Sequence, residues 1–235
     1  WTRAFWWAFV QALIVRMIAR RCAGVVTNRS SSQQWLRGAA REGCPVQMRP
    51  VFSNVGEPET TQPLQHRGNH AVVFGGTKLK RKVYCEQGEE VCSRLRDLDI
   101  ERILDIGPSP DVDISGGFDL PVTKKGILPS GAISKYLMDS RIGLVHCPSD
   151  CITKSGVAAA YLAHGTVPLA VSEVETEHLE KNHHYLTLSD PSGDLTPGMS
   201  RAGSRWYCKQ SRSEGAAELF LTLIHTSVRH AEASP

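Results

Sequence analysis

Residues 142–171 read IGLVHCPSDCITKSGVAAAYLAHGTVPLAV, and this stretch gives the strongest evidence for the fold. Its two ends, residues 142–146 and 167–171, are continuous apolar runs without the polar alternation of a strand that has one wet face. The segment between them is rich in Ala and stops at Gly165, a residue that commonly ends a helix. A strand, a helix and a second strand of this kind predict two parallel neighbours in a sheet that helices cover.

The same alternation continues on both sides of this stretch. Compact apolar runs predict further strands at residues 70–74, 102–106 and 120–123. Helices are expected at about 82–98 and from Ser130 onward, because apolar residues recur there at helical spacing. A last helix is expected at about 213–228, after an irregular stretch. The pattern predicts an α/β fold, a Rossmann-like parallel sheet flanked by helices.

The chain divides into four predicted segments. Residues 1–48 carry two helices and two short strands, and residues 49–69, rich in Pro, Gln, Thr and Gly, are expected to form a linker. Residues 70–210 hold the alternating domain, and residues 211–235 a helix and tail. The first residue is Trp rather than Met, so we expect this chain to be part of a longer one.

Composition narrows the function classes. The 235 residues are 41% hydrophobic and 22% charged, which excludes wholesale disorder and a multi-spanning membrane protein. The net charge of +3 argues against a dedicated nucleic-acid binder. Seven Cys without a CxxC pair favour free thiols in a reducing compartment, so we expect a cytoplasmic protein. No metal site is predicted, since the local cluster of His146, Cys147 and Cys151 is explained equally well by the end of a buried strand.

The start of the chain is unusually apolar. Residues 5–18 form an apolar run that Arg16 interrupts, and the run is shorter than the roughly 20 residues of a membrane span. One interpretation is a packed helix with a broad apolar face. The other is peripheral contact of residues 1–21 with a membrane, with Trp6 and Trp7 at the interface, which would place the protein at the inner face of the membrane.

Glycines and cations follow the predicted strands. Ligands of open parallel sheets bind at the carboxyl ends of the strands, and glycine-rich turns and helix N-termini bind phosphate there. The turn at 75–76 matches no established phosphate-loop pattern, and a tight turn or a helix cap is the alternative explanation for some of these residues. The candidate phosphate-site residues are Gly75, Gly76, Lys78, Arg81, Gly126, Leu128, Ser149, Lys154, Ser155 and Gly156.

Three segments together resemble one family. HAVVFGG (70–76), VTKKGILPSGAISKYLMDSRIGLVHCPSD (122–150) and SGVAAAYLAHGTVPLAVSE (155–173) resemble the C-terminal, donor-binding half of GT-B glycosyltransferases, most of all the retaining family 4 group. CAGVVTNRSSSQQWL (22–36) is similar to the end of that family's N-terminal lobe, of which residues 1–48 would be a remnant. The resemblance implies transfer of a sugar from a nucleotide diphosphate sugar to an unknown sugar or lipid-linked acceptor, with no separate cofactor.

The resemblance also implies roles for individual residues. Lys154 and Arg81, with Lys78, would stabilise the diphosphate leaving group, and residues 126–128 would edge the base. The family's Glu-x7-Glu pair is missing, because its positions match residues 152–153 and Ala160. One of three later carboxylates would hold the ribose instead: Glu173, Glu175 or Glu177. Two alternatives stay open, a non-catalytic GT-B-like binding or assembly module and a sugar-nucleotide enzyme such as an epimerase.

Overall fold

The computed structural model describes residues 3–108, 118–147, 151–174, 176 and 178–232. The chain forms two compact units. The smaller unit combines residues 1–50 with 213–235, and the larger unit comprises residues 51–212.

The larger unit is built on a six-stranded sheet in which every pairing is parallel, in the order β5-β4-β3-β6-β7-β8. The order reverses between β3 and β6, which places a crevice for ligands at the carboxyl ends of these two strands. The predicted α/β fold is confirmed. The strands are β3 (Gly68–Phe74), β4 (Arg102–Ile106), β5 (Val122–Gly126), β6 (Ser140–Val145), β7 (Val167–Ala170) and β8 (Leu186–Thr187).

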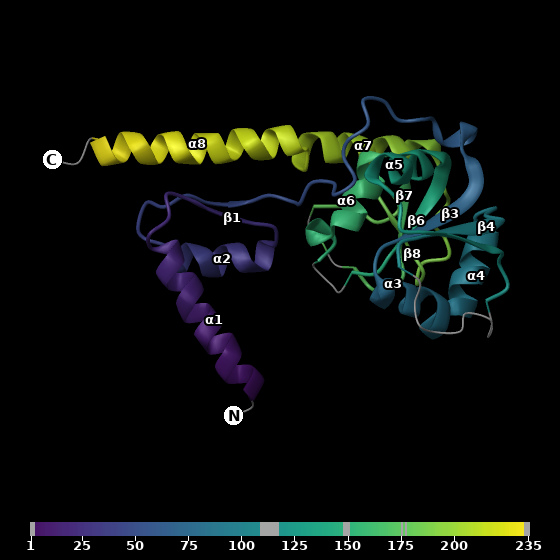
Figure 1. Cartoon of the computed structure of the whole chain (residues 1–235), viewed down its shortest axis with the longest axis horizontal. Coiled ribbons are helices and arrows are strands. Elements are labelled where there is room, and N and C mark those ends of the chain that lie inside the picture. Colours follow the sequence, from purple (N-terminus) through teal and green to yellow (C-terminus); the bar gives the residue numbers. More distant parts are fainter. Residues whose placement is uncertain (1–2, 109–117, 148–150, 175, 177, 233–235) are drawn as a thin grey trace. The chain divides into compact units, whose positions relative to one another are not determined.

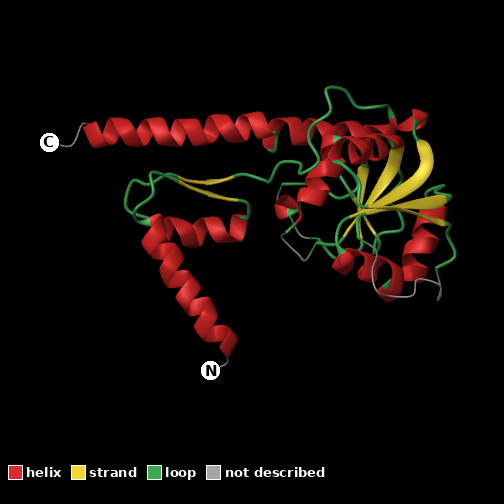
Figure 2. Cartoon of the chain, viewed as in Figure 1, coloured by secondary structure: helices red, strands yellow, loops and turns green. Residues whose placement is uncertain are grey.

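Helices cover both faces of the sheet (Figures 1 and 2). Val72 packs with Leu137 and Tyr161 on one face, and its neighbour Val73 packs with Leu95 on the other, so β3 is buried on both sides as its apolar run predicts. The helical elements of this unit are the 3₁₀ turn η1 (Leu64–His66), α3 (Thr77–Arg81), the π-helical turn η2 (Lys82–Glu86), α4 (Gly88–Asp97), α5 (Ser130–Asp139), the 3₁₀ turn η3 (Ile152–Lys154), α6 (Gly156–Ala163) and α7 (Pro197–Gln210).

Several element bounds differ from the sequence prediction. The helix expected at 82–98 begins at Thr77 and is divided into α3, η2 and α4, with a break at Gln87. The Ala-rich helix expected to stop at Gly165 is divided into η3 and α6, and Gly165 ends it at φ +67° as predicted. The stretch expected to be irregular contains β8 and the fourteen-residue helix α7.

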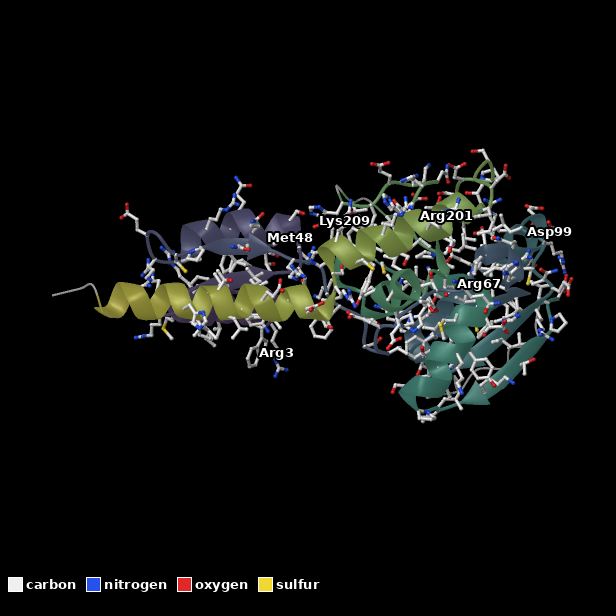
Figure 3. All side chains as sticks on the ribbon, turned by 90° about the horizontal axis from the view of Figure 1, so that it is seen from above. Arg3, Met48, Arg67, Asp99, Arg201 and Lys209 are labelled. Atoms are coloured by element: carbon white, nitrogen blue, oxygen red, sulfur yellow. The ribbon has the colours of Figure 1, made fainter. Side chains whose placement is uncertain are left out.

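Most of the segment expected to be a linker, residues 51–69, belongs to the larger unit. Val55 and Leu64 are buried, and so is the guanidinium of Arg67 (Figure 3). Arg67 donates hydrogen bonds to the carbonyl oxygens of Ser140 (3.0 Å), His164 (2.8 Å) and Gln62 (2.9 Å). Burial lowers the pKa of Arg67 to about 10, which leaves the side chain charged at neutral pH. Arg67 therefore closes the amino-terminal edge of the sheet.

The smaller unit contains a two-stranded parallel ladder and three helices. Leu223 of the last helix packs closely against the backbone at Gly24. A Cβ atom on Gly24 would lie only 2.8 Å from Cδ2 of Leu223. The second helix ends at Ala39, four residues before Gly43. The elements are α1 (Arg3–Ala19), β1 (Val25–Thr27), α2 (Ser30–Ala39), β2 (Val46–Met48) and α8 (Ser213–Glu232).

Helix α1 is apolar on all sides. Phe5, Trp6 and Trp7 are consecutive, so their side chains point about 100° apart around the helix axis, and each is more than 40% exposed. A membrane-surface helix has one apolar and one strongly polar face, and α1 lacks that asymmetry. Contact of residues 1–21 with a membrane stays a prediction. Within the described ranges, every helix is too short or too polar to cross a membrane.

Candidate functional site

The glycine turns after β3, β4 and β5 contact one another. The Gly75 N–H donates to the Ile106 carbonyl (3.4 Å), and the Gly107 N–H donates to the Gly126 carbonyl (2.7 Å). Gly107 has φ +109°, and a Cβ atom there would lie 2.8 Å from the Gly75 oxygen. A side chain at position 107 would therefore separate the turns. The carboxyl edge of the sheet thus presents a continuous strip of backbone that a ligand can approach closely.

The first turn of α6 lies at the same edge. A Cβ atom on Gly75 would lie 3.8 Å from Cγ2 of Val157, the second residue of α6. The Ser155 hydroxyl caps the helix by accepting the Ala158 N–H (3.2 Å). Tyr161 fixes α6 to the sheet, because its hydroxyl accepts the Phe74 N–H (3.0 Å) and donates to the Leu144 carbonyl (3.1 Å). The N-terminus of α6 and the glycine strip therefore form one surface with partial positive charge.

The lysines beside this surface have different environments. Lys80 is fully buried, forms an ion pair with Asp105 and donates a hydrogen bond to the Pro108 carbonyl (2.7 Å). The Tyr84 hydroxyl donates to the same carboxylate (2.9 Å), and burial together with Asp105 raises the pKa of Tyr84. Lys80 therefore supports the turn after β4 from beneath and is not available to an anion.

The exposed cations remain for a ligand. Lys78 and Lys154 are exposed, and neither pairs with a carboxylate among the residues that the structure describes. Arg81 differs, because its Nε atom lies 3.9 Å from Glu86. Lys82 also binds Glu86 (2.8 Å), and this hydrogen bond holds the pKa of Glu86 below its usual range. Arg81 and Lys82 thus share the carboxylate of Glu86, whereas Lys78 and Lys154 have no carboxylate partner among the described residues.

His146 is a site candidate, although its position at the end of a buried strand predicts a structural role. It follows β6 directly, and its partly buried ring has a pKa below the usual value, first because of burial and then because of Lys82 and Lys78. Its Nδ1 atom is buried without a hydrogen-bond partner among the described residues. His164, by contrast, is fully buried, with Nδ1 2.7 Å from the Ala160 carbonyl oxygen and Nε2 2.9 Å from the Ser134 hydroxyl. His164 therefore has a structural role.

The sheet edge continues toward β5 on one side and β7 on the other. Gly126 (φ +67°) is the last residue of β5, and the half-buried Leu128 follows the strand. On the other side, Glu173 is exposed and lines a hollow of about 390 Å³ with Ser172 and Glu90. The Ser172 hydroxyl accepts the Cys147 N–H (3.2 Å), which joins the turns after β6 and β7.

The positions that match the missing Glu pair are buried. Ala160 is 0% and Ile152 is 2% exposed, so a carboxylate at either position would lie in the core. Burial raises the pKa of the Cys147 thiol to about 11, so this cysteine is a poor nucleophile. Three predicted site residues lie outside the described ranges: Ser149, Glu175 and Glu177.

The sheet, its flanking helices and the glycine-lined edge define a Rossmann-like lobe of the GT-B type. A sucrose-phosphate synthase from Thermosynechococcus elongatus superimposes with a TM-score of 0.61 at 13% identity, over 94% of this chain and 62% of that one. TarM from S. aureus, solved with UDP and other ligands, gives 0.58 at 13% identity, over 91% of this chain and 46% of that one. An α,α-trehalose 6-phosphate synthase from Burkholderia multivorans gives a TM-score of 0.58 at 12% identity, over 94% of this chain and 62% of that one.

These structures establish the GT-B fold, and at such identities they establish the fold alone. The chain spans 62% and 46% of the lengths of the first two. No family model and no curated protein matches the sequence.

Proposed function

We propose that this chain carries the donor-binding lobe of a glycosyltransferase that uses a nucleotide diphosphate sugar. One observation carries the proposal: the glycine strip, the start of α6 and the unpaired Lys78 and Lys154 share one edge of the sheet. Such an edge suits a diphosphate, whose oxygens accept hydrogen bonds from backbone N–H groups and attract cations. The UDP in the structures of TarM and of an α-glucosyltransferase supports this choice of ligand.

The residues take the following roles. Gly75, Gly76 and Gly156 allow the diphosphate to approach the backbone, and Ser155 orients the start of α6 as its cap. Gly126 and Leu128 edge the base. Glu173 binds ribose hydroxyls from the hollow after β7.

The reaction transfers a glycosyl group. The bond between the anomeric carbon and the diphosphate oxygen breaks, and its electron pair stays on that oxygen. The acceptor oxygen forms the new bond to the anomeric carbon, and its proton passes to the departing diphosphate oxygen. Lys154 and Lys78 stabilise the negative charge that develops on the leaving group, and Arg81 contributes less while Glu86 binds it. Retention of configuration, as in the family 4 group, belongs to this proposal, as does a sugar or lipid-linked acceptor.

Titration of the full chain with UDP, GDP and ADP tests the proposal. One of the three should raise the melting temperature at millimolar concentration. Lys154→Ala should weaken that binding about tenfold, the effect of losing one charge-assisted hydrogen bond. Lys135→Ala, which removes an exposed lysine of α5, is the matched control and should bind as the unchanged chain does. If none of the diphosphates binds, the proposal is wrong.

A non-catalytic module is the second candidate. The buried Ala160 and Ile152 favour it, because the carboxylates of the family's pair have no counterpart at these positions. This candidate predicts that a diphosphate binds while a UDP-, GDP- or ADP-sugar is neither hydrolysed nor transferred. Release of the nucleoside diphosphate from the sugar donor, measured in the chain that binds it, separates the two candidates.

A further inference from the structure

A second hollow lies along α7. It has a volume of about 420 Å³. The histidines on its wall precede β8, so the hollow begins near the amino edge of the sheet, opposite the glycine strip. We call this hollow the α7 groove. The ring-bearing and charged side chains that line it are His183, His184, Arg201, Arg205, Trp206 and Lys209.

Three cations line one face of the helix. Arg201, Arg205 and Lys209 are four residues apart, which places neighbouring Cα atoms about 6 Å from each other along the axis (Figure 3 labels the first and last). All three are exposed, and among the described residues none of them pairs with a carboxylate. Arg212, only a few residues further, does bind Glu57 (3.6 Å). Like charges four residues apart destabilise a helix, so this row is unfavourable until an anion neutralises it.

The two histidines beside the row are poorly suited to bind a metal. Glu180, His183 and His184 have potential ligand atoms within 4.8 Å of one another. However, His184 Nδ1 accepts the Glu180 N–H (2.9 Å), which assigns the proton of the neutral ring to Nε2. Nε2 is then not a free ligand, and Nδ1 becomes one only if this hydrogen bond breaks. The neutral ring instead offers an N–H donor, and burial followed by the neighbouring His183 keeps the pKa of His184 below its usual value.

Two further features of the groove suit a ligand that is part ring and part anion. Gly198 lies on the groove in the first turn of α7, where the free N–H groups of a helix carry partial positive charge. Trp206 packs against the core and is half-buried, so its indole forms a fixed platform beside the cations. A flat or ring-shaped group can stack on such a platform.

We propose that the α7 groove binds a small ligand that carries two phosphate groups on a sugar-like ring. The row of three cations exceeds what one phosphate needs, and the volume lies in the range of small-molecule sites rather than of polymer-binding channels. This site is independent of the nucleotide-sugar assignment, because it shares no residue with the glycine strip.

Calorimetric titration of the full chain with a hexose 1,6-bisphosphate and a hexose 6-phosphate tests the proposal. The bisphosphate should bind at one site, and the monophosphate at least tenfold more weakly. The double variant Arg201→Ala/Arg205→Ala should lose at least tenfold in bisphosphate affinity, whereas Lys135→Ala should lose nothing. Both arginines are exposed, so the double variant should fold, which its melting temperature checks.

Four results would overturn the proposal. The first is the absence of saturable bisphosphate binding at millimolar concentration, and the second is equal affinity for the two sugar phosphates. The third is stabilisation by Zn²⁺ without bisphosphate binding, lost in His183→Ala, which would make the cluster a metal site. Displacement of the bisphosphate by UDP would assign it to the glycine strip and also contradict the α7 site. UDP binding by the double variant is measured separately, so failure here leaves the donor site standing.

Discussion

The two edges of the sheet use similar residues in opposite ways. At the amino edge, the buried cation Arg67 donates to three carbonyl groups, and both ring nitrogens of His164 have partners. At the carboxyl edge, Lys78 and Lys154 are exposed, and the buried Nδ1 of His146 has no partner among the described residues. Polar groups without protein partners are costly unless water or a ligand binds them. Folding therefore satisfies the polar groups of Arg67 and His164, whereas those of Lys78, Lys154 and His146 are left for water or a ligand.

The largest expected effect comes from the buried cation beneath the carboxyl edge. Lys80→Met leaves Asp105 charged, buried and without its ion pair, and should lower the free energy of unfolding by about 4 kcal/mol. Lys78→Met, two residues earlier and exposed, should change it by less than about 0.5 kcal/mol. Urea denaturation of both variants measures the difference.

A double variant sharpens this test. Lys80→Met/Asp105→Leu removes both charges and should recover most of the lost stability. Equal effects of Lys80→Met and Lys78→Met would contradict the buried pair and would return Lys80 to the ligand-binding cations.

The next effect is expected at the amino edge. Arg67→Met leaves the Ser140, His164 and Gln62 carbonyls without their donor and should cost about 3 kcal/mol, because water replaces part of the lost hydrogen bonding. UDP affinity should stay unchanged when it is measured well below the melting temperature. A loss of UDP affinity without a loss of stability would show that the two edges are not separate in function.

Much of the fold could be predicted from the sequence, for a physical reason. Strands buried on both faces are continuous apolar runs, so β3, β4, β6 and β7 were visible without any partner information. Helix α7 was missed because its buried face alternates large and small residues, with Gly203 between Met199 and Tyr207. Gly203 lets the helix approach Leu162 closely, a tertiary reason that helix propensity does not carry. The one local signal was Thr196 followed by Pro197, a helix cap and a first-turn proline.

The sequence predicts which residues can belong to the candidate site, but not the environment of each side chain. The sequence identifies the glycines and lysines that follow strands, and parallel topology brings them to one edge. It gives no means of telling Lys80 from Lys78, because burial of a lysine depends on the position of Asp105 across the sheet. For the same reason the sequence does not distinguish His146 from His164, although only His164 has hydrogen-bond partners for both ring nitrogens among the described residues.

A smaller effect distinguishes capping from ligand binding at α6. Ser155→Ala should lower the free energy of unfolding by about 1 kcal/mol, because the Ala158 N–H loses its acceptor. Thr196→Ala removes the equivalent cap of α7, where Thr196 accepts the Met199 N–H (3.2 Å), and should cost a similar amount. UDP affinity should fall in the first variant and not in the second.

Ser155→Asp completes that comparison. Aspartate caps a helix as well as serine does, so stability should return, while its negative charge should repel a diphosphate. Ser155→Asp with undiminished UDP affinity would remove the start of α6 from the donor site.

The smallest expected effect is a pH dependence that separates the two histidines. His146 has a folded-state pKa below that of the unfolded chain, so it is neutral at pH 7, and stability falls as pH drops below about 6.5, where the unfolded chain binds the proton first. A diphosphate beside His146 favours the charged ring and raises its pKa, so UDP binding should take up protons as the pH falls through the titration range of histidine, and should strengthen there. Calorimetry in buffers of different ionisation enthalpy measures this uptake. His146→Gln should abolish it. The pKa of His164 is also lowered, first because of burial, but its ring faces the Ala160 carbonyl rather than the ligand edge. Proton uptake that survives in His146→Gln would therefore show that the diphosphate binds elsewhere.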